Sequence, residues 1–434
     1  NGKAGMNRQW KQFMPRVGIV WDPKGNGRMS IRASYGIFYD RIPTEYHLDT
    51  TTAPPFGART TLTNPQGGLA NPWLGYPGGN PFPYVLDPNN PYYNLNGTFN
   101  TFPYDMRMPY VQQWTLSVQR QFGGNWLASA SYLGNEMVHL NGALGVNPGV
   151  FLGTQPCVLN GVSFPVCSTQ ANLPQRRLLN QINPSAGKYF GSITQADDGG
   201  TGSYHGLMLS LERRFSRGVT VSANYTWSHC ISNLINNQPN GDNIVDLYPN
   251  NRHLDRGNCN LSATDRRHIA NLTAVGEMPR FQEKWRQWIV SGWRASATAS
   301  MQSGNFVTIA TGIDQAMTGY GNQRGNQVLS NVYGNGSVNE WINPLAFALP
   351  ALGTNGNTGL GIVKAPGLLV FNAGLSRLFN LRERQTLELR AEAQNVLNHT
   401  NFNPPVSALN SPTFGQLTSS GPARIFQFGV KYVF

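Results

Sequence analysis

The feature that most constrains the fold is the recurrence of apolar residues at every second position in segments of about ten residues. In residues 219–228 (VTVSANYTWS), Val, Val, Ala, Tyr and Trp alternate with Thr, Ser, Asn, Thr and Ser. Such alternation is typical of a β-strand with one apolar and one polar face. The pattern predicts eleven strands, over residues 13–21, 29–40, 110–122, 125–134, 204–215, 218–229, 267–278, 288–303, 368–379, 385–397 and 423–434.

Short and long connections alternate between these segments. Tight turns are expected at 22–28, 123–124, 216–217 and 380–384, and long loops at 41–109, 135–203, 230–266, 304–367 and 398–422. The one medium link, 279–287, falls where a short one belongs. The order predicts an all-β, antiparallel up-and-down transmembrane β-barrel of the outer membrane. Its turns would be periplasmic, its long loops extracellular, its outer face apolar and its lumen polar.

A secreted β-sandwich or propeller would also alternate apolar and polar positions. The outer face of such a protein usually carries many Lys and Glu, whereas only 12% of the 434 residues here are charged. A soluble domain averages about 25%. The low charge also argues against a cytosolic enzyme and against a charged disordered tail. The net charge of +12 is dispersed, without a run of five like charges, so no nucleic-acid partner is expected.

The four cysteines form two close pairs, Cys157 with Cys167 and Cys230 with Cys259, in segments rich in Asn, Pro and Gly. Two local disulfides in an oxidising compartment are expected, the alternative being four free thiols on loops. The sequence has no stretch approaching 18 apolar residues, and residues 1–12 lack the apolar core of a signal peptide. An oxidised protein without a signal leads us to expect a fragment that lacks its N-terminal part.

The last predicted strand carries an unbroken apolar and aromatic face that ends on the final residue. A terminal Phe preceded by such residues at every second position resembles the signal that the outer-membrane assembly machinery reads on its substrates. An ordinary terminal strand of a soluble protein is the alternative. The predicted assembly signal consists of Phe426, Phe428, Val430, Tyr432 and Phe434.

Two further sets of residues are candidates for function. The polar strand faces predict a lumen-facing network toward a plug or channel, formed by Arg32, Arg294, Glu388, Arg390, Glu392 and Gln394. Loop aromatics beside Pro, Gly and Asn suit stacking on sugars or gripping peptides, unless they only pack the loops together or form an interfacial girdle. The candidate loop-binding aromatics are Trp73, Tyr76, Tyr84, Tyr92, Tyr93, Tyr320 and Trp341.

Motifs for catalysis, cofactors or metals are incomplete. The sequence contains no GK[ST] phosphate loop, no HExxH and no GxSxG. Asp197 and Asp198, or Asp242 and Asp246, would offer oxygens to Ca²⁺, but neither pair has EF-hand spacing. We therefore expect no enzymatic activity, no cofactor and no metal.

Three blocks resemble a narrower family. They are FMPRVGIVWDPKGNGRMSIRASYGIFYDR (13–41), ATDRRHIANLTAVGEMP (263–279) and LELRAEAQNVLNHTNFNPP (387–405). They look like the barrel of TonB-dependent outer-membrane receptors, closest to the Oar-like group, which has a carboxypeptidase-regulatory-like domain, a plug and a barrel. The resemblance implies that residues 1–434 are the C-terminal part of a single barrel domain of about 22 strands. The small N-terminal domain, the TonB box, the plug and the first strands would be absent.

The resemblance also implies a function in the cell outer membrane. The whole protein would take up a large or scarce nutrient, such as an oligosaccharide, a peptide or a siderophore-like compound, captured by its loops. Expected partners are outer-membrane lipid and lipopolysaccharide, the protein's own plug, the periplasmic TonB complex and the barrel assembly machinery. The alternative is a passive porin or a surface adhesion barrel. An outer-membrane hydrolase would further require a Ser, a His and an acidic residue that meet at the rim. The identity of the substrate is left open.

Overall fold

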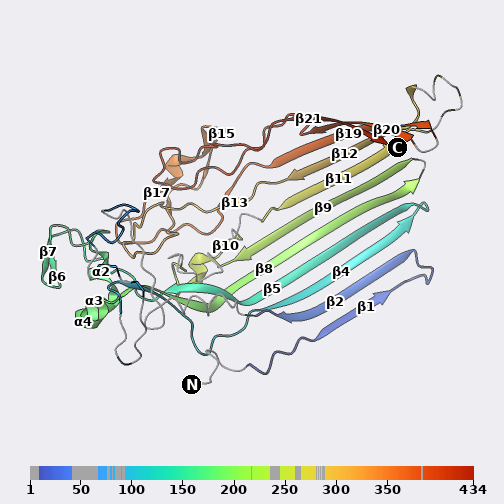
Figure 1. Ribbon diagram of the computed structural model, residues 1–434. Helices are drawn as coiled ribbons and strands as arrows, with labels where there is room; N and C mark the ends of the chain where they lie inside the picture. Colours follow the sequence, from blue (N-terminus) through green and yellow to red (C-terminus); the bar gives the residue numbers. More distant parts are fainter. Residues whose placement is uncertain are drawn as a thin grey trace.

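One large antiparallel sheet organises the chain (Figure 1). The computed structural model describes residues 9–41, 67–75, 79–80, 82–83, 89, 93–216, 218–234, 245–259, 265–279, 281, 283, 285, 289–382 and 385–434. Along the sheet the strands follow their order in the chain, as in an up-and-down meander. In spatial order they are β1 (Arg16–Trp21), β2 (Met29–Tyr39), β4 (Tyr110–Phe122), β5 (Trp126–Gly145), β8 (Phe190–Ser216), β9 (Val219–Ser232), β11 (His268–Glu277), β12 (Trp293–Gln302), β19 (Leu368–Arg382), β20 (Gln385–Gln394) and β21 (Ile425–Val433).

Each of the segments that alternation predicts overlaps one of these strands, but two strands are much longer than expected. β5 continues to Gly145 and β8 begins at Phe190, although alternation predicts 125–134 and 204–215. Their pairing continues through Glu136↔Ser203 to Gly145↔Thr194, with bulges on the way. The extra length of β8 is polar and Gly-rich, so hydrogen bonding extends the hairpin where alternation has stopped. The predicted loop 135–203 is accordingly shorter.

The register divides the sheet into two faces of opposite character. Tyr225, Ala270, Met301 and Leu369 are successive cross-strand partners on the apolar face. One position along, Asn224, Asn271 and Ser300 are partners on the polar face. Side chains alternate between the two faces of a strand, so this register makes one face of the sheet apolar and the other polar.

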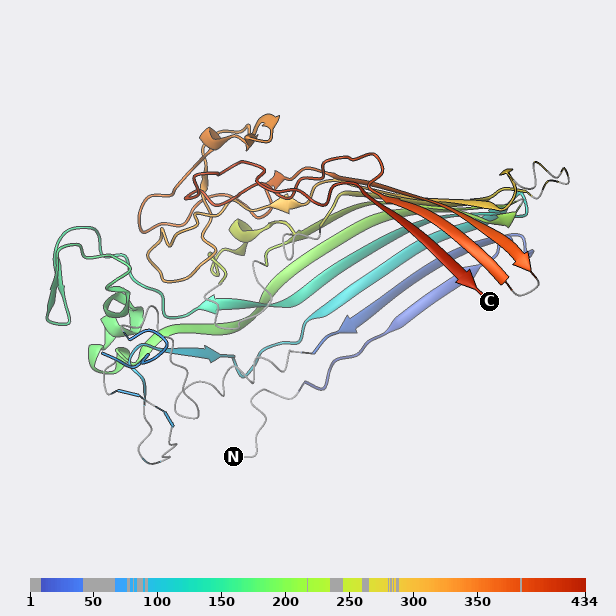
Figure 2. The ribbon, with the colours of Figure 1, turned by 45° about the horizontal axis from the view of Figure 1, so that its top comes forward.

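Short connections gather at one end of the sheet, called here the turn end, and long ones at the other, called the loop end (Figures 1 and 2). Small elements fill the loops. They are β3 (Gly97–Thr101), β6 (Cys157–Leu159), β7 (Val162–Phe164), α2 (Leu173–Arg176), α3 (Leu178–Ile182), α4 (Pro184–Gly187), η1 (Arg252–Asp255), β10 (Gly257–Asn258), β13 (Phe306–Val307), β14 (Asn326–Gln327), β15 (Tyr333–Ser337), β16 (Glu340–Ile342), η3 (Pro344–Ala346), β17 (Phe347–Ala348) and β18 (Val363–Lys364).

Residues 146–189, 245–259, 304–367 and 398–422 pack together at the loop end, and we call them the loop cap. The loop cap has its own apolar cluster of Ile309, Ile342, Ala346, Phe347 and Val363. Backbone hydrogen bonds join its segments, as from Gly149 N to Thr318 O at 2.8 Å and from Trp341 N to Gly415 O at 2.9 Å. The predicted long loops are therefore largely folded where the structure describes them.

Two disulfides strengthen this region. Cys157 is joined to Cys167 and Cys230 to Cys259, with Cα–Cα distances of 5.2 and 5.4 Å. The first closes the β6–β7 hairpin. The second is not confined to a loop, because Cys230 lies within β9 and pairing of this strand extends to β10.

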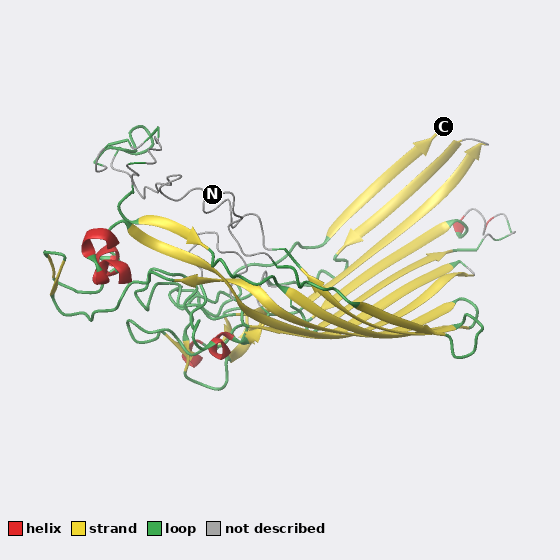
Figure 3. Ribbon diagram, turned by 90° about the horizontal axis from the view of Figure 1, so that it is seen from below, coloured by secondary structure: helices red, strands yellow, loops and turns green. Residues whose placement is uncertain are grey.

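The sheet is curved and open (Figure 3). In the described part of the chain β1 pairs with β2 alone and β21 with β20 alone. Both edge strands run from the loop end toward the turn end, since β1 precedes a short turn and β21 follows a long loop. None of the described helices is long and apolar enough to span a membrane.

Candidate functional site

The polar face of the sheet carries rows of hydrogen-bonded hydroxyl and amide groups. The hydroxyls of Ser117 and Ser131 lie 2.7 Å apart across β4 and β5. Farther along the sheet, Asn271 donates to Asn224 at 3.1 Å, and Ser300 donates to Asn271 at 2.9 Å. A face of this kind is suited to water and to polar solutes.

The predicted lumen-facing residues all belong to this polar face, but they do not form one cluster. Arg390 makes a bidentate contact with Glu388, at 2.7 and 3.0 Å, within β20. Arg294 on β12 lies 3.9 Å from Glu277 on β11, and both side chains are exposed. Arg32 is opposite Ser117, on the far side of the sheet. Four of the six residues thus lie together on β20, and Arg32 is apart from them.

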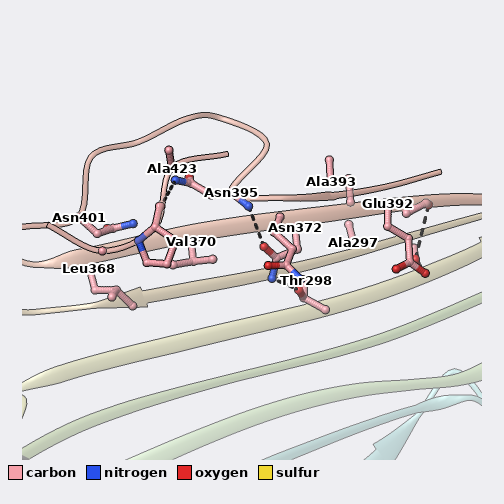
Figure 4. A pocket seen from close by; sticks show the side chains of 16 residues that line it. Ala297, Thr298, Leu368, Val370, Asn372, Glu392, Ala393, Asn395, Asn401 and Ala423 are labelled. Atoms are coloured by element: carbon pink, nitrogen blue, oxygen red, sulfur yellow. Dashed lines mark hydrogen bonds between the residues drawn. The ribbon is translucent and has the colours of Figure 1, made fainter. Parts of the chain in front are cut away.

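A groove of about 430 Å³ lies over β12, β19 and β20 near the loop end (Figure 4). Glu392 and Gln394, two of the predicted residues, line it together with Thr298 and Asn372. Asn372 donates to Thr298 Oγ1 at 3.2 Å. Amide, hydroxyl and one carboxylate group are therefore available to a polar ligand, and the lining contains no pair of carboxylates placed for acid–base catalysis.

Two buried asparagines fold the chain over the end of this groove. The backbone N–H of Asn395 donates to Asn372 Oδ1 at 2.9 Å, and its side chain donates to the carbonyl of His399 at 2.9 Å. The Asn401 side chain donates to Leu369 O and accepts from Leu369 N, at 2.9 and 2.7 Å. Sequence reasoning missed Asn395 and Asn401. Asn395 has a φ of 48°, and asparagine adopts positive φ more readily than most residues. An asparagine just after a strand is therefore the sequence signal for such a turn.

The loop cap is tied to β8 by an arginine shared between two aspartates. Arg252 lies 2.6 Å from Asp197 of β8 and 2.9 Å from Asp246. Burial raises the pKa of Asp246 to about 7, because the loss of water outweighs the attraction of Arg252, and the nearby Asp197 and Asp255 carboxylates add to the rise. Asp246 therefore titrates near neutral pH.

Two further arginines are buried inside the loop cap. Arg324 and Asp255 form an ion pair at 2.7 Å in which both side chains are 1% exposed. Arg176 is fully buried and donates to the carbonyls of Val150, Thr169 and Met317 at 2.8 to 3.1 Å. Burial lowers the pKa of both Arg176 and Arg324. These contacts fix the cap segments relative to one another.

The candidate calcium ligands have other partners. Asp197 binds Arg252, and Asp198 makes a bidentate contact with Arg107 at 2.9 and 3.1 Å. Asp242 lies outside the described residues. No group of three or more His, Cys, Asp or Glu able to hold a metal occurs in the described ranges.

The predicted loop aromatics have different environments. Tyr320 is 3% exposed and donates to Ile193 O at 2.8 Å, so it packs the cap against β8, and it also lines a pocket together with Arg177 and Gln323. Trp341 packs on the apolar cluster and donates to Lys364 O at 3.0 Å, which is also a packing role. Trp73 lies beside Phe82, and Tyr93 beside Tyr189, with ring centroids 5.9 and 6.4 Å apart. Three others, Tyr76, Tyr84 and Tyr92, lie outside the described residues.

The predicted assembly residues share one exposed face of the edge strand. Phe426, Phe428, Val430 and Tyr432 are between 49% and 78% exposed on the apolar face of β21. Phe434 follows the strand, is 89% exposed and stacks on Tyr432 at 5.9 Å.

One family of known proteins accounts for nearly the whole chain. The family described as "Outer membrane beta barrel domain" matches residues 1–427. Among solved structures, the outer membrane transporter YddB from Escherichia coli is 15% identical, with a TM-score of 0.47 over 97% of this chain and 40% of that chain. The FrpB iron transporter from Neisseria meningitidis is 10% identical, with a TM-score of 0.41 over 97% of this chain and 39% of that one.

A third similar structure is the ferric enterobactin receptor PfeA of Pseudomonas aeruginosa. It is 10% identical, with a TM-score of 0.43 over 97% of this chain and 40% of that one. The chain thus spans about two fifths of the length of these structures. No curated protein matches the chain.

Proposed function

Because this chain belongs to the outer membrane beta-barrel family and so lies in the outer membrane, we propose that it forms part of the wall of a TonB-dependent receptor. The observation that carries the proposal is the two-faced sheet: one face is apolar and exposed, and the other bears rows of hydroxyl and amide groups. In a bilayer the first would contact lipid, and the second would line the lumen.

The two open edges support a larger barrel. Unpaired strand edges are not viable in hydrocarbon, so β1 and β21 need partners in the membrane. Both run toward the turn end, and pairing them directly, within one chain or between two copies, would give a parallel contact. Antiparallel closure requires an odd number of additional strands between them. Eleven more would give the 22 of large plugged transporters, and we propose that residues 1–434 are one part of such a barrel domain.

The proposed activity is the uptake of a large or scarce nutrient, with capture at the loop end and passage along the polar face. The groove that includes Thr298, Asn372 and Glu392 supports the second step, since its amide and hydroxyl groups suit a polar solute. The resemblance of three sequence blocks to Oar-like receptors supports coupling to a plug and to the periplasmic TonB complex. A passive porin or an adhesion barrel is the alternative.

Planar-bilayer conductance of the full-length protein in potassium chloride tests this proposal. A receptor closed by a plug is expected to give little steady conductance, and deletion of the sequence that encodes the plug should open a large pore. A large steady conductance of the unaltered protein would overturn the receptor proposal in favour of a porin. A barrel that stays closed after the deletion would also contradict it.

A further inference from the structure

A second groove, of about 540 Å³, lies on the apolar face of the sheet at the loop end. It is found where β11 begins at His268, β12 ends at Gln302 and β19 begins at Leu368. Ala270, Met301 and Leu369 form its floor, and they are direct cross-strand partners. The groove therefore opens on the apolar face of the sheet, at the loop end of β11, β12 and β19.

The rim of this groove is polar. Tyr225, His268, Ser303 and His399 line it. The Tyr225 hydroxyl lies 2.8 Å from His268 Nδ1, and the two rings are stacked. The backbone N–H of His268 donates to Ser303 Oγ at 3.1 Å, which fixes the hydroxyl at the edge of the groove.

A cation lies beside the rim. Arg266 precedes His268 by two residues and donates from Nη1 to the carbonyl of Ser303 at 2.8 Å. Burial lowers the pKa of Arg266, and no carboxylate contributes a compensating rise. The lining itself also contains no carboxylate. The site thus combines an apolar floor, hydrogen-bonding side chains and a partly buried positive charge without a countercharge among the described residues.

We propose that this groove binds a phosphorylated lipid of the outer membrane. Its acyl chain would lie on Ala270, Met301 and Leu369, and its phosphate would contact Arg266 and His268. The groove and such a lipid are complementary in two respects: the cation faces the phosphate, and the apolar floor faces the acyl chain. A guanidinium group in a partly desolvated place gains most from a phosphate, and an acyl chain covers apolar surface that water would otherwise contact. The site does not depend on whether the barrel transports a substrate.

Native mass spectrometry of the full-length protein in detergent tests the site with defined probes. Dipalmitoyl phosphatidic acid should remain bound, whereas dipalmitoylglycerol, which lacks the phosphate, should not. Arg266→Gln should weaken retention roughly tenfold, which corresponds to the loss of one charge-assisted hydrogen bond. Met301→Trp, which fills the floor and leaves every charge in place, should also weaken it.

Arg120→Gln is the matched control, because Arg120 is an exposed cation on the apolar face of β4 near the turn end. This variant should retain phosphatidic acid as the unaltered protein does. If Arg120→Gln and Arg266→Gln lost phosphatidic acid to the same extent, the binding would be a nonspecific effect of net charge, and the proposal would be overturned. Equal retention of dipalmitoylglycerol would overturn it too, as would displacement of phosphatidic acid by millimolar inorganic phosphate, which would make the ligand a free anion. A folded Met301→Trp variant that retains the lipid fully would exclude the proposed floor.

Discussion

Several of the few charged residues of this chain form ion pairs that join segments of the loop cap. Arg252 joins two aspartates of different segments, and Arg324 meets Asp255 where both side chains are buried. A buried ion pair adds little net stability, but removing one partner leaves the other charged and desolvated. These residues therefore determine how the cap segments fit together more than how stable the whole sheet is.

Replacing Arg324 by Met should unfold the cap locally. We expect a loss of about 3–5 kcal/mol in its stability, because Asp255 would be left without its partner. Hydrogen exchange of residues 245–259 and 304–367 measures this loss. Arg107→Gln is the control. Arg107 pairs with Asp198, its side chain is 60% exposed, and an exposed ion pair contributes about 0–1 kcal/mol to stability. Similar losses in the two variants would contradict the role of burial.

The stability of the cap should depend on pH through Asp246. Its pKa is raised from 3.8 to about 7, so between these values the folded cap holds a proton that the unfolded chain has released. The free energy of unfolding should therefore fall as the pH rises from about 4 to about 7, by up to about 1.4 kcal/mol per pH unit, and level off above 7. Hydrogen exchange at several pH values measures the slope. Asp246→Asn should flatten it, and an unchanged slope would assign the effect to other groups.

At the scale of elements, alternation locates strands well and measures their length poorly. β4 spans residues 110–122 as predicted. Its apolar residues from Trp114 to Val118 stand at every second position and so mark one continuous face. β5 and β8 extend beyond the segments in which apolar and polar residues alternate. Their Gly- and Asn-rich extensions pair with each other through the backbone, and such pairing does not require alternation in the sequence. The clustering of Ile309 with Ile342 and Val363 was also beyond prediction. Isolated apolar residues in long polar loops become a core only through tertiary contacts.

Strand alternation also made part of the candidate site predictable. Glu392 and Gln394 were recognised because strand alternation fixes the face on which they lie. The turn that closes their groove depends on Asn395 and Asn401, whose hydrogen bonds to neighbouring strands carry no periodic signal. Composition does not distinguish an aromatic that packs a loop, as Tyr320 does, from one that faces a ligand.

The edge strand β21 permits a test of the assembly signal. Phe434→Ala should lower the amount of full-length protein assembled in the outer membrane several-fold, because it removes the last aromatic of the exposed apolar face. Heat-modifiable migration of membrane fractions on gels measures assembly. Val433→Ala, on the opposite face of the strand, should have little effect. Normal assembly of the Phe434 variant would show that the terminal aromatic is dispensable.

At the scale of the whole molecule, the sheet has one apolar face, one polar face and two edges that could pair with each other only in a parallel arrangement. Since β1 and β21 run in the same direction, any strands that close the proposed barrel would have to supply an antiparallel neighbour for each. Membrane insertion makes this requirement strict, because water is not available to hydrogen-bond the open backbone groups.

Hydrogen exchange of the full-length protein in bilayers tests the closure. All amides of β1 between Arg16 and Trp21 should be protected, including those that do not face β2. The amides of the turn at residues 22–28 should exchange quickly in the same sample and serve as an internal reference. Rapid exchange at alternate β1 residues would show that the edge remains open in the membrane and would contradict the barrel proposal.

The long β5–β8 hairpin gives the molecule a considerable height. β8 has 27 residues, which at about 3.3 Å per residue correspond to roughly 90 Å of extended chain. Transmembrane strands need only about 9–11 residues. If the loop end faces outward as proposed, the remainder works as a stalk that holds the disulfide-linked β6–β7 tip well above the headgroups. The tip would then lie far from the membrane wall, joined to it only through the two long strands and the loop cap.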